Sequence, residues 1–96
     1  MDAPFFRLAD ALDALPCMAD PSSREIVIGQ LPSAIAGAIH RHNQRRMEVM
    51  EILRACLDYR DGVRQLLAVA QGLEGDSLPL RRLSAVVAEV LPQLGG

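Results

Sequence analysis

A chain of 96 residues, half of them apolar, is long enough for one modest hydrophobic core. The ten basic residues are all arginines, and with twelve acidic residues they give a net charge of −2 at pH 7. This balance argues against a general nucleic-acid-binding protein and against a polybasic membrane anchor. We therefore expect one domain over residues 1–96, with its core in about residues 5–92 and a tail or linker at 93–96.

Two features of the chain bear on where the protein acts. The first residues contain no basic segment followed by an apolar run, so they do not resemble a secretory signal. The longest uncharged stretch, 26–39, is shorter than the ~20 apolar residues that span a bilayer. We therefore expect a cytoplasmic protein that enters no membrane and whose two cysteines are reduced.

The first predicted helix ends at Pro16 and carries its apolar residues on one face: Phe5, Leu8, Leu12 and Leu15. After a turn over 17–21, Ser22 and Glu25 have the spacing of a capping box, in which each side chain accepts the other residue's backbone N–H. A second helix is expected to begin there. The β-branched run 26–28 also fits a strand, but it is short and no second strand is predicted to pair with it, so helix is favoured.

The stretch 47–57 has apolar residues at three- and four-residue spacing, which predicts the central core helix of the fold. A shorter helix is expected before it, with Pro32 in its first turn. Asn43 has a side chain suited to capping the central helix, which should end near Tyr59. Leu53 lies in the middle of the apolar face and is expected to be fully buried.

Two more helices are predicted after the central one. Asp61 is suited to capping the fifth helix, and Gly72 or Gly75 to ending it. A sixth helix is expected to start at about Asp76 to Ser77, with a proline in its first turn. Six short helices without a repeat predict an all-α bundle.

The residues that carry most metal and nucleophilic chemistry are few. His40 and His42 are two positions apart, so on a helix they point to different faces and do not form the metal-binding pair of an i, i+4 spacing. Cys56 lies on the apolar face of the central helix, whereas Cys17, beside a proline in a turn, is expected to be the more exposed thiol. The sequence contains no phosphate-binding loop, nucleophile elbow or metal-spaced cluster. We expect no enzyme activity, no cofactor and no metal.

The segment 75–78, Gly-Asp-Ser-Leu, is similar to the attachment site of acyl and peptidyl carrier proteins, whose serine carries phosphopantetheine. In such carriers three helices follow the serine, whereas residues 78–96 leave room for one. We therefore interpret Asp76 and Ser77 as a helix cap. A carrier-like domain with Ser77 as its attachment site is the alternative function.

Charges gather at both ends of the central helix. The basic pole comprises Arg41, Arg45 and Arg46 at its start, and the acidic pole comprises Asp58, Asp61, Glu74 and Asp76 after its end. Both poles oppose the helix dipole, at a cost of ~0.3–1 kcal/mol per charge. They are either solvated faces that neighbouring residues neutralise, or poles about 20 Å apart that meet complementary charges on another molecule. The second interpretation predicts weak, salt-sensitive self-association.

Taken together, the pattern resembles the second family of bacterial effector-associated domains. The matching positions span about residues 5–92 and are Leu12, Leu15-Pro16, Asp20, Arg24, Leu31-Pro32, Ile35, Ile39, Arg41, Val49, Ile52, Cys56, Leu66-Leu67, Glu74-Gly75-Asp76-Ser77 and Leu83. The resemblance implies a six-helix antiparallel bundle with a death-like fold. It also implies a non-enzymatic adaptor in bacterial defence signalling, whose partners are like helical domains on effectors or sensors, such as peptidase or ATPase fusions.

Overall fold

A computed structural model describes residues 3–94, and this part of the chain contains helices and no strand. The elements in order are α1 (Ala3–Asp13), the 3₁₀ helix η1 (Pro16–Met18), α2 (Pro21–Gln30), α3 (Ser33–Ala38), α4 (Arg45–Leu57), α5 (Gly62–Glu74), α6 (Leu78–Val90) and the 3₁₀ helix η2 (Leu91–Leu94). The predicted all-α class is confirmed, including helix at 26–28. None of these helices is long and apolar enough to cross a membrane. Of the predicted tail, residues 95–96 lie outside the described part.

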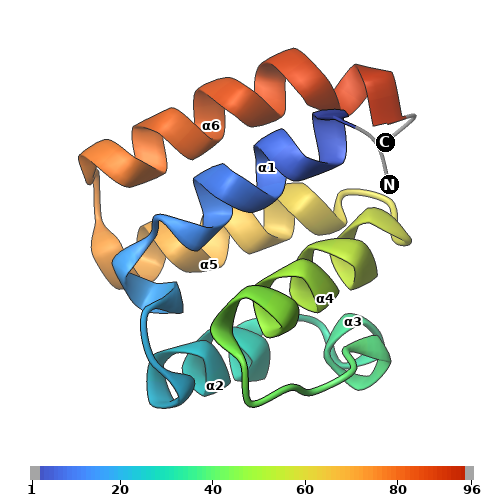
Figure 1. The fold of residues 1–96 in the computed structure, drawn as a ribbon, viewed down its shortest axis with the longest axis vertical. Coiled ribbons are helices and arrows are strands. Elements are labelled where there is room, and N and C mark those ends of the chain that lie inside the picture. Colours follow the sequence, from blue (N-terminus) through green and yellow to red (C-terminus); the bar gives the residue numbers. More distant parts are fainter. Residues whose placement is uncertain (1–2, 95–96) are drawn as a thin grey trace.

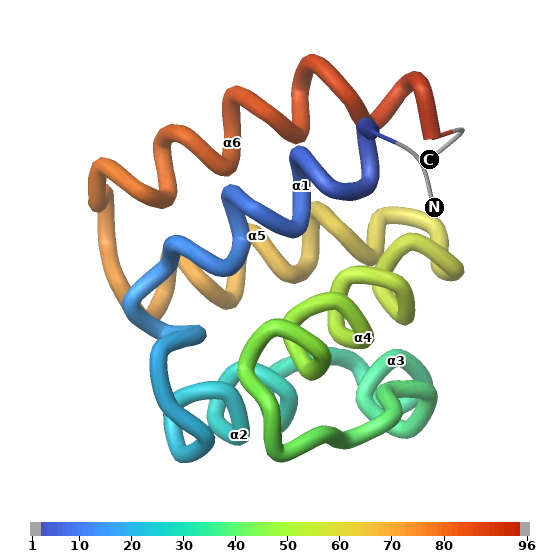
Figure 2. Tube along the Cα trace, in the orientation of Figure 1, coloured from blue at the N-terminus to red at the C-terminus, as the bar shows by residue number. Residues whose placement is uncertain are grey.

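The helices form an antiparallel bundle (Figure 1). α1 packs against α6 and α4, and α5 packs against α4 and α6. The chain trace in Figure 2 shows that α1 and α6 run in opposite directions, as do α4 and α5. α2 and α3 lie on the side of α4 that faces away from α1 and α6, at the bottom of both views. α1 also contacts η2, so the two ends of the described chain lie together.

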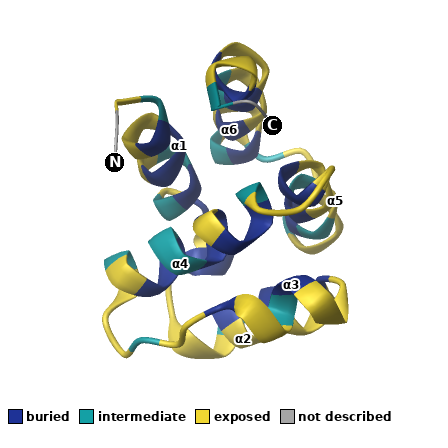
Figure 3. Ribbon diagram, turned by 90° about the vertical axis from the view of Figure 1, so that its right-hand side faces the viewer, coloured by how far each residue is buried: buried dark blue, intermediate teal, exposed yellow. Residues whose placement is uncertain are grey.

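The core is built around α4, as the apolar spacing of 47–57 predicts. Buried residues face inward from every helix in Figure 3. On α4 the buried apolar residues are Val49, Ile52, Leu53, Ala55 and Cys56. The side chain of Leu53 is 1% exposed, which confirms the prediction for this residue. Met47, in the first turn, is 40% exposed and contributes less to the core than the spacing indicates.

The predicted capping box at Ser22 and Glu25 is wrong, because α2 and its cap begin two residues earlier. Pro21 takes the first helical position, where its fixed φ is favourable and its missing N–H costs nothing. Asp20 is then the cap, and its carboxylate accepts the Ser23 N–H at 2.8 Å. This hydrogen bond lowers the pKa of Asp20. The Glu25 carboxylate instead accepts hydrogen bonds from Arg41, in the segment before α4.

The caps of α4 and α5 also differ from the prediction. Gln44, not Asn43, precedes α4, and its side chain makes no capping hydrogen bond. The helix ends at Leu57, two residues before Tyr59. Asp61 does precede α5, but it has a left-handed backbone with φ of 60°, and its side chain caps nothing.

The predicted boundaries between α5 and α6 are confirmed. Gly75 follows the last residue of α5 and has φ of +70°, a conformation that favours glycine. Ser77 caps α6, since its hydroxyl accepts the Leu80 N–H at 3.2 Å. Pro79 occupies the first turn of α6 as expected.

Gly62→Ala should destabilise the protein by about 1–3 kcal/mol, through overpacking. Gly62 is buried in the first turn of α5, and a Cβ atom there would collide with the carbonyl oxygen of Cys56. The measurement is urea unfolding followed by circular dichroism. Gly72→Ala is the control, because a Cβ at this position of α5 meets nothing within 4 Å. It should stabilise the protein by about 0.5–1 kcal/mol. Equal stability of the two variants would contradict the predicted collision.

Candidate protein-interaction surface

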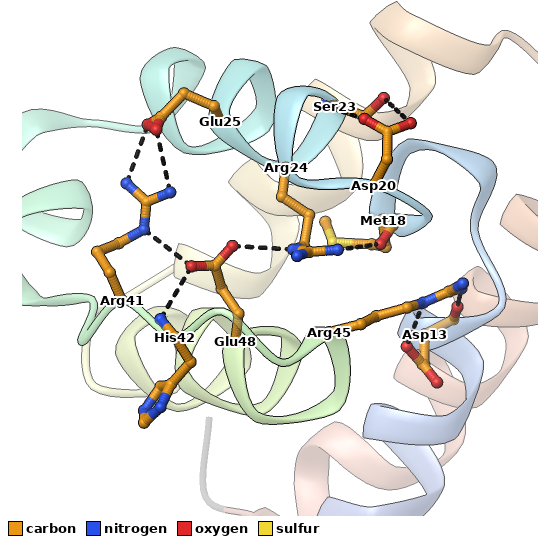
Figure 4. A network of polar contacts seen from close by, with 10 residues as sticks. All are labelled: Asp13, Met18, Asp20, Ser23, Arg24, Glu25, Arg41, His42, Arg45 and Glu48. Atoms are coloured by element: carbon orange, nitrogen blue, oxygen red, sulfur yellow. Dashed lines mark hydrogen bonds and ion pairs between the residues drawn. The ribbon is translucent and has the colours of Figure 1, made fainter.

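The basic pole lies at the start of α4, but each of its arginines is bound to carboxylates of the same chain. Arg41 makes two hydrogen bonds to Glu25, of 2.9 and 3.0 Å, and donates through Nε to Glu48 at 3.0 Å (Figure 4). The hydrogen bonds that Arg41 donates to Glu25 and Glu48 raise the pKa of Arg41, and the bond to Glu25 lowers the pKa of Glu25. The Arg41 side chain is nevertheless 45% exposed.

The other two arginines of the basic pole fasten α4 to α1. Arg45 donates to the carboxylate of Asp13 at 2.9 Å and to the Asp13 carbonyl. Arg46 lies 2.8 Å from the Asp10 carboxylate. Both side chains remain partly exposed, at 42% and 35%. The structure therefore brings the three arginines to one end of α4 and neutralises much of their charge with residues of α1 and α2.

Beneath the basic pole lies a buried ion pair that the charge pattern did not predict. The Nε of Arg24 donates to Glu48 at 2.8 Å, and another guanidinium nitrogen donates to the Met18 carbonyl at 2.9 Å. The two charged side chains are 2% and 3% exposed. The sequence does contain an indication that Arg24 is buried. Arg24 lies three and four positions before Val27 and Ile28, so all three share one face of α2.

Glu48 is the centre of this network (Figure 4). Its carboxylate accepts hydrogen bonds from Arg24, from Arg41 and from the backbone N–H of His42, the last at 3.1 Å. Burial by itself would raise the pKa of Glu48, but the hydrogen bonds outweigh burial and lower it. Glu48 thus joins α2, the segment before α4 and α4 itself.

The structure does not bring the four members of the acidic pole together. Asp58 and Asp61 lie in the turn before α5, whereas Glu74 and Asp76 lie at its far end, about 20 Å away along a helix of 13 residues. Asp76 pairs with Arg81 at 2.7 Å. Whether these residues or the basic pole contact a partner stays a prediction.

Glu74 has a structural role at that far end. Its carboxylate accepts the Cys17 N–H and the Ser77 hydroxyl, both at 2.9 Å, and so ties η1 to the start of α6. The Ser77 hydroxyl is therefore engaged in two hydrogen bonds at the start of α6, in agreement with the capping interpretation of Ser77. The Asp76 carboxylate binds Arg81 and caps no helix.

The expectation that Cys17 is an exposed thiol is wrong. η1 packs against α5 and α2, which leaves Cys17 buried. Burial, followed by the interaction of the thiol with the Glu74 carboxylate, raises the Cys17 pKa to about 12. Cys56 is buried in the core as predicted, and burial raises its pKa to about 12 as well. Within residues 3–94, no group of three His, Cys, Asp or Glu side chains is arranged to hold a metal ion.

The fold and this surface define a small helical-bundle domain in which internal ion pairs hold the arginines at the start of α4. The chain belongs to the effector-associated domain 2 family, whose model matches residues 9–88. The match covers the bundle from the middle of α1 to the last turns of α6, and it confirms the family indicated by the sequence. No curated protein and no solved structure shows a significant match to the chain.

Proposed function

We propose that this protein is a non-enzymatic adaptor that recruits or couples an effector or a sensor through contacts with a like helical domain. The observation that carries the proposal is the effector-associated domain match over residues 9–88. In this proposal the partner domain belongs to a peptidase or ATPase of a bacterial defence system, and the contact forms in the cytoplasm.

The arginines at the start of α4 support such a role. Ion pairs with α1 and α2 hold them in place, yet their side chains stay 35–45% exposed. Charged groups that are already ordered lose less conformational entropy when a partner binds. Complementary charge at an interface gives specificity and a faster association rate more than raw affinity. A salt-sensitive contact of moderate affinity is therefore expected.

The proposal is tested by titrating the protein with the effector-associated domain of a peptidase or ATPase encoded beside it. The double variant Arg45→Gln and Arg46→Gln should bind about 2- to 30-fold more weakly, since each exposed charge pair contributes ~0.2–1 kcal/mol. The difference should shrink as salt rises above 0.1 M, where the screening length is about 10 Å. Absence of binding by the unmodified protein would contradict the adaptor role.

A matched control separates contact with the partner from support of the fold. Asp10→Asn with Asp13→Asn removes the same ion pairs between α1 and α4 but keeps the arginines. It should lose less affinity than the arginine double variant, because the arginines keep their charge and lose only the order that the carboxylates provide. Equal loss in both double variants would mean that the arginines act only by holding α1 on α4. Neutral replacements are preferable to glutamate, which would be repelled by Asp10 and Asp13.

A further inference from the structure

Almost all the acidic and arginine side chains of this protein are engaged within the chain. Even exposed ones form pairs, such as Arg7 with Glu89 at 2.8 Å. In the described part of the chain, no ion pair or hydrogen bond is made by the side chains of Asp58, Arg60 and Arg82. These charges lie on two separate surfaces, the turn between α4 and α5 and the start of α6.

The first surface is the turn at 58–61. Asp58 and Arg60 flank Tyr59, whose side chain is 40% exposed. The turn is tight, because the Gly62 N–H donates to the Tyr59 carbonyl at 3.0 Å and Asp61 adopts a left-handed backbone. The turn therefore presents an aromatic ring between an acid and a base on a short, ordered segment. Tyrosine and arginine are enriched among the residues that dominate binding energy at protein interfaces.

The second surface is a groove of about 560 Å³ between α1 and α6. These helices lie side by side in Figure 1. Small apolar residues line the groove between its rims: Ala11, Ala14, Pro79, Ala85 and Val86. Arg82 lies on the α6 rim. Asp10 lies on the α1 rim together with Arg7, which is paired with Glu89. The Asp10 side chain is 70% exposed although it pairs with Arg46. The groove thus has an unpaired base on its α6 side and an apolar floor, and on its α1 side an acid beside an arginine whose charge Glu89 compensates.

We propose that the 58–61 turn of one copy of this chain docks into the α1–α6 groove of a second copy. Tyr59 would pack on the alanines, Asp58 would face Arg82, and Arg60 would face Asp10. The inference rests on the proposed function, since it is a contact between like domains. A second copy is the occupant because the two charges of the turn, Asp58 and Arg60, are opposite in sign to Arg82 and Asp10 on the rims of the same sequence's groove. The contact joins different surfaces, so it repeats from copy to copy instead of closing into a two-fold dimer.

The test is sedimentation of the full chain at low salt over a range of concentrations. The parent should form oligomers that grow with concentration. Tyr59→Ala removes the ring from the turn, and Ala85→Arg fills the groove with a side chain that suits an exposed helix position. Each variant alone should associate at least about tenfold more weakly. Circular dichroism checks that both keep the parent's helix content.

A mixture of the two variants gives the decisive result. The Tyr59→Ala copy keeps an intact groove and the Ala85→Arg copy keeps an intact turn, so the mixture should form a 1:1 dimer that grows no further. Leu73→Ala is the control, because Leu73 is 45% exposed on α5 away from both surfaces. It should assemble like the parent.

A parent that is monomeric at every concentration would overturn the inference. So would variants that assemble like the parent, or a mixture that forms no dimer. Loss of assembly in Leu73→Ala alone would place the contact on the α2–α5 side instead. These outcomes leave the adaptor role standing, because binding of an effector's domain is measured separately. Conversely, self-assembly without binding to any effector domain would contradict only the adaptor role.

Discussion

Glu48→Ala should lower the free energy of unfolding by about 3–5 kcal/mol, because Arg24 would stay buried without its counter-ion. The guanidinium would keep its hydrogen bond to the Met18 carbonyl but lose the carboxylate 2.8 Å away. The measurement is urea unfolding at pH 7. Glu51→Ala is the matched control on the same helix, since its ion pairs are longer, at 3.6 and 3.9 Å. It should cost less than about 1 kcal/mol.

The pH dependence provides a second check on Glu48. Its pKa is lower in the folded protein than in the unfolded chain, where glutamate has a pKa of about 4.3. Its stabilising contribution is therefore complete above that value and is lost as the pH falls through the folded pKa. The difference in unfolding free energy between the parent and Glu48→Ala should shrink over the same range. A difference that is constant down to the acid transition would contradict the role of the ionised carboxylate.

A double variant separates charge burial from packing. Arg24→Met with Glu48→Leu removes both charges together and fills the space with apolar groups. Replacing both members of a buried ion pair by apolar residues often leaves the stability of the fold unchanged or raises it. Removing only one member strongly lowers the stability, because the other charge stays buried without a partner. Here recovery should be partial, because the Met18 carbonyl and the His42 N–H lose their partners, at about 1–3 kcal/mol each. Both variants leave the His42 N–H unpaired, so a double variant less stable than Glu48→Ala by the full cost of the lost Met18 contact would show that the unpaired charge is not the cause.

Leu53→Ala should cost about 2–5 kcal/mol, the usual range for a buried leucine truncated to alanine. Leu53 is 1% exposed in the middle of α4, the helix that separates α1 from α3 and also packs against α5. A protein of this size has a total stability of about 5–15 kcal/mol, so the loss is a large part of it. Urea unfolding measures the change, and circular dichroism shows whether the variant still folds.

Met47→Ala, one to two turns earlier on the same helix, is the control for Leu53. Its side chain is 40% exposed, so it should lose less than about 1 kcal/mol. A similar loss at both positions would mean that helix propensity and not core packing sets the cost. A loss below about 1 kcal/mol at Leu53 would mean that α4 is not the centre of the core.

Much of the fold was predictable because the relevant information is local. Apolar spacing along 47–57 identifies α4, since a helix buries residues three and four positions apart. Gly75 and Ser77 mark the α5–α6 boundary through their own backbone and side-chain preferences. The wrong capping box at Ser22 and Glu25 also has a cause within a few residues of the sequence. The motif was present, but Pro21 suits the first helical position better and moves the cap to Asp20.

The sequence by itself determined the helices and most of their buried faces, because these follow from residue spacing along the chain. It indicated the family through a resemblance of matching residues. Only the tertiary structure decided which charges meet. Arg24 and Glu48 are 24 positions apart, and Arg45 reaches Asp13 across 32 positions, so spacing within a helix does not relate them. The length of α5 separates Asp61 from Glu74, two members of the acidic pole. Ion pairing depends on distances of a few ångströms between elements, and those distances are set by how the helices pack.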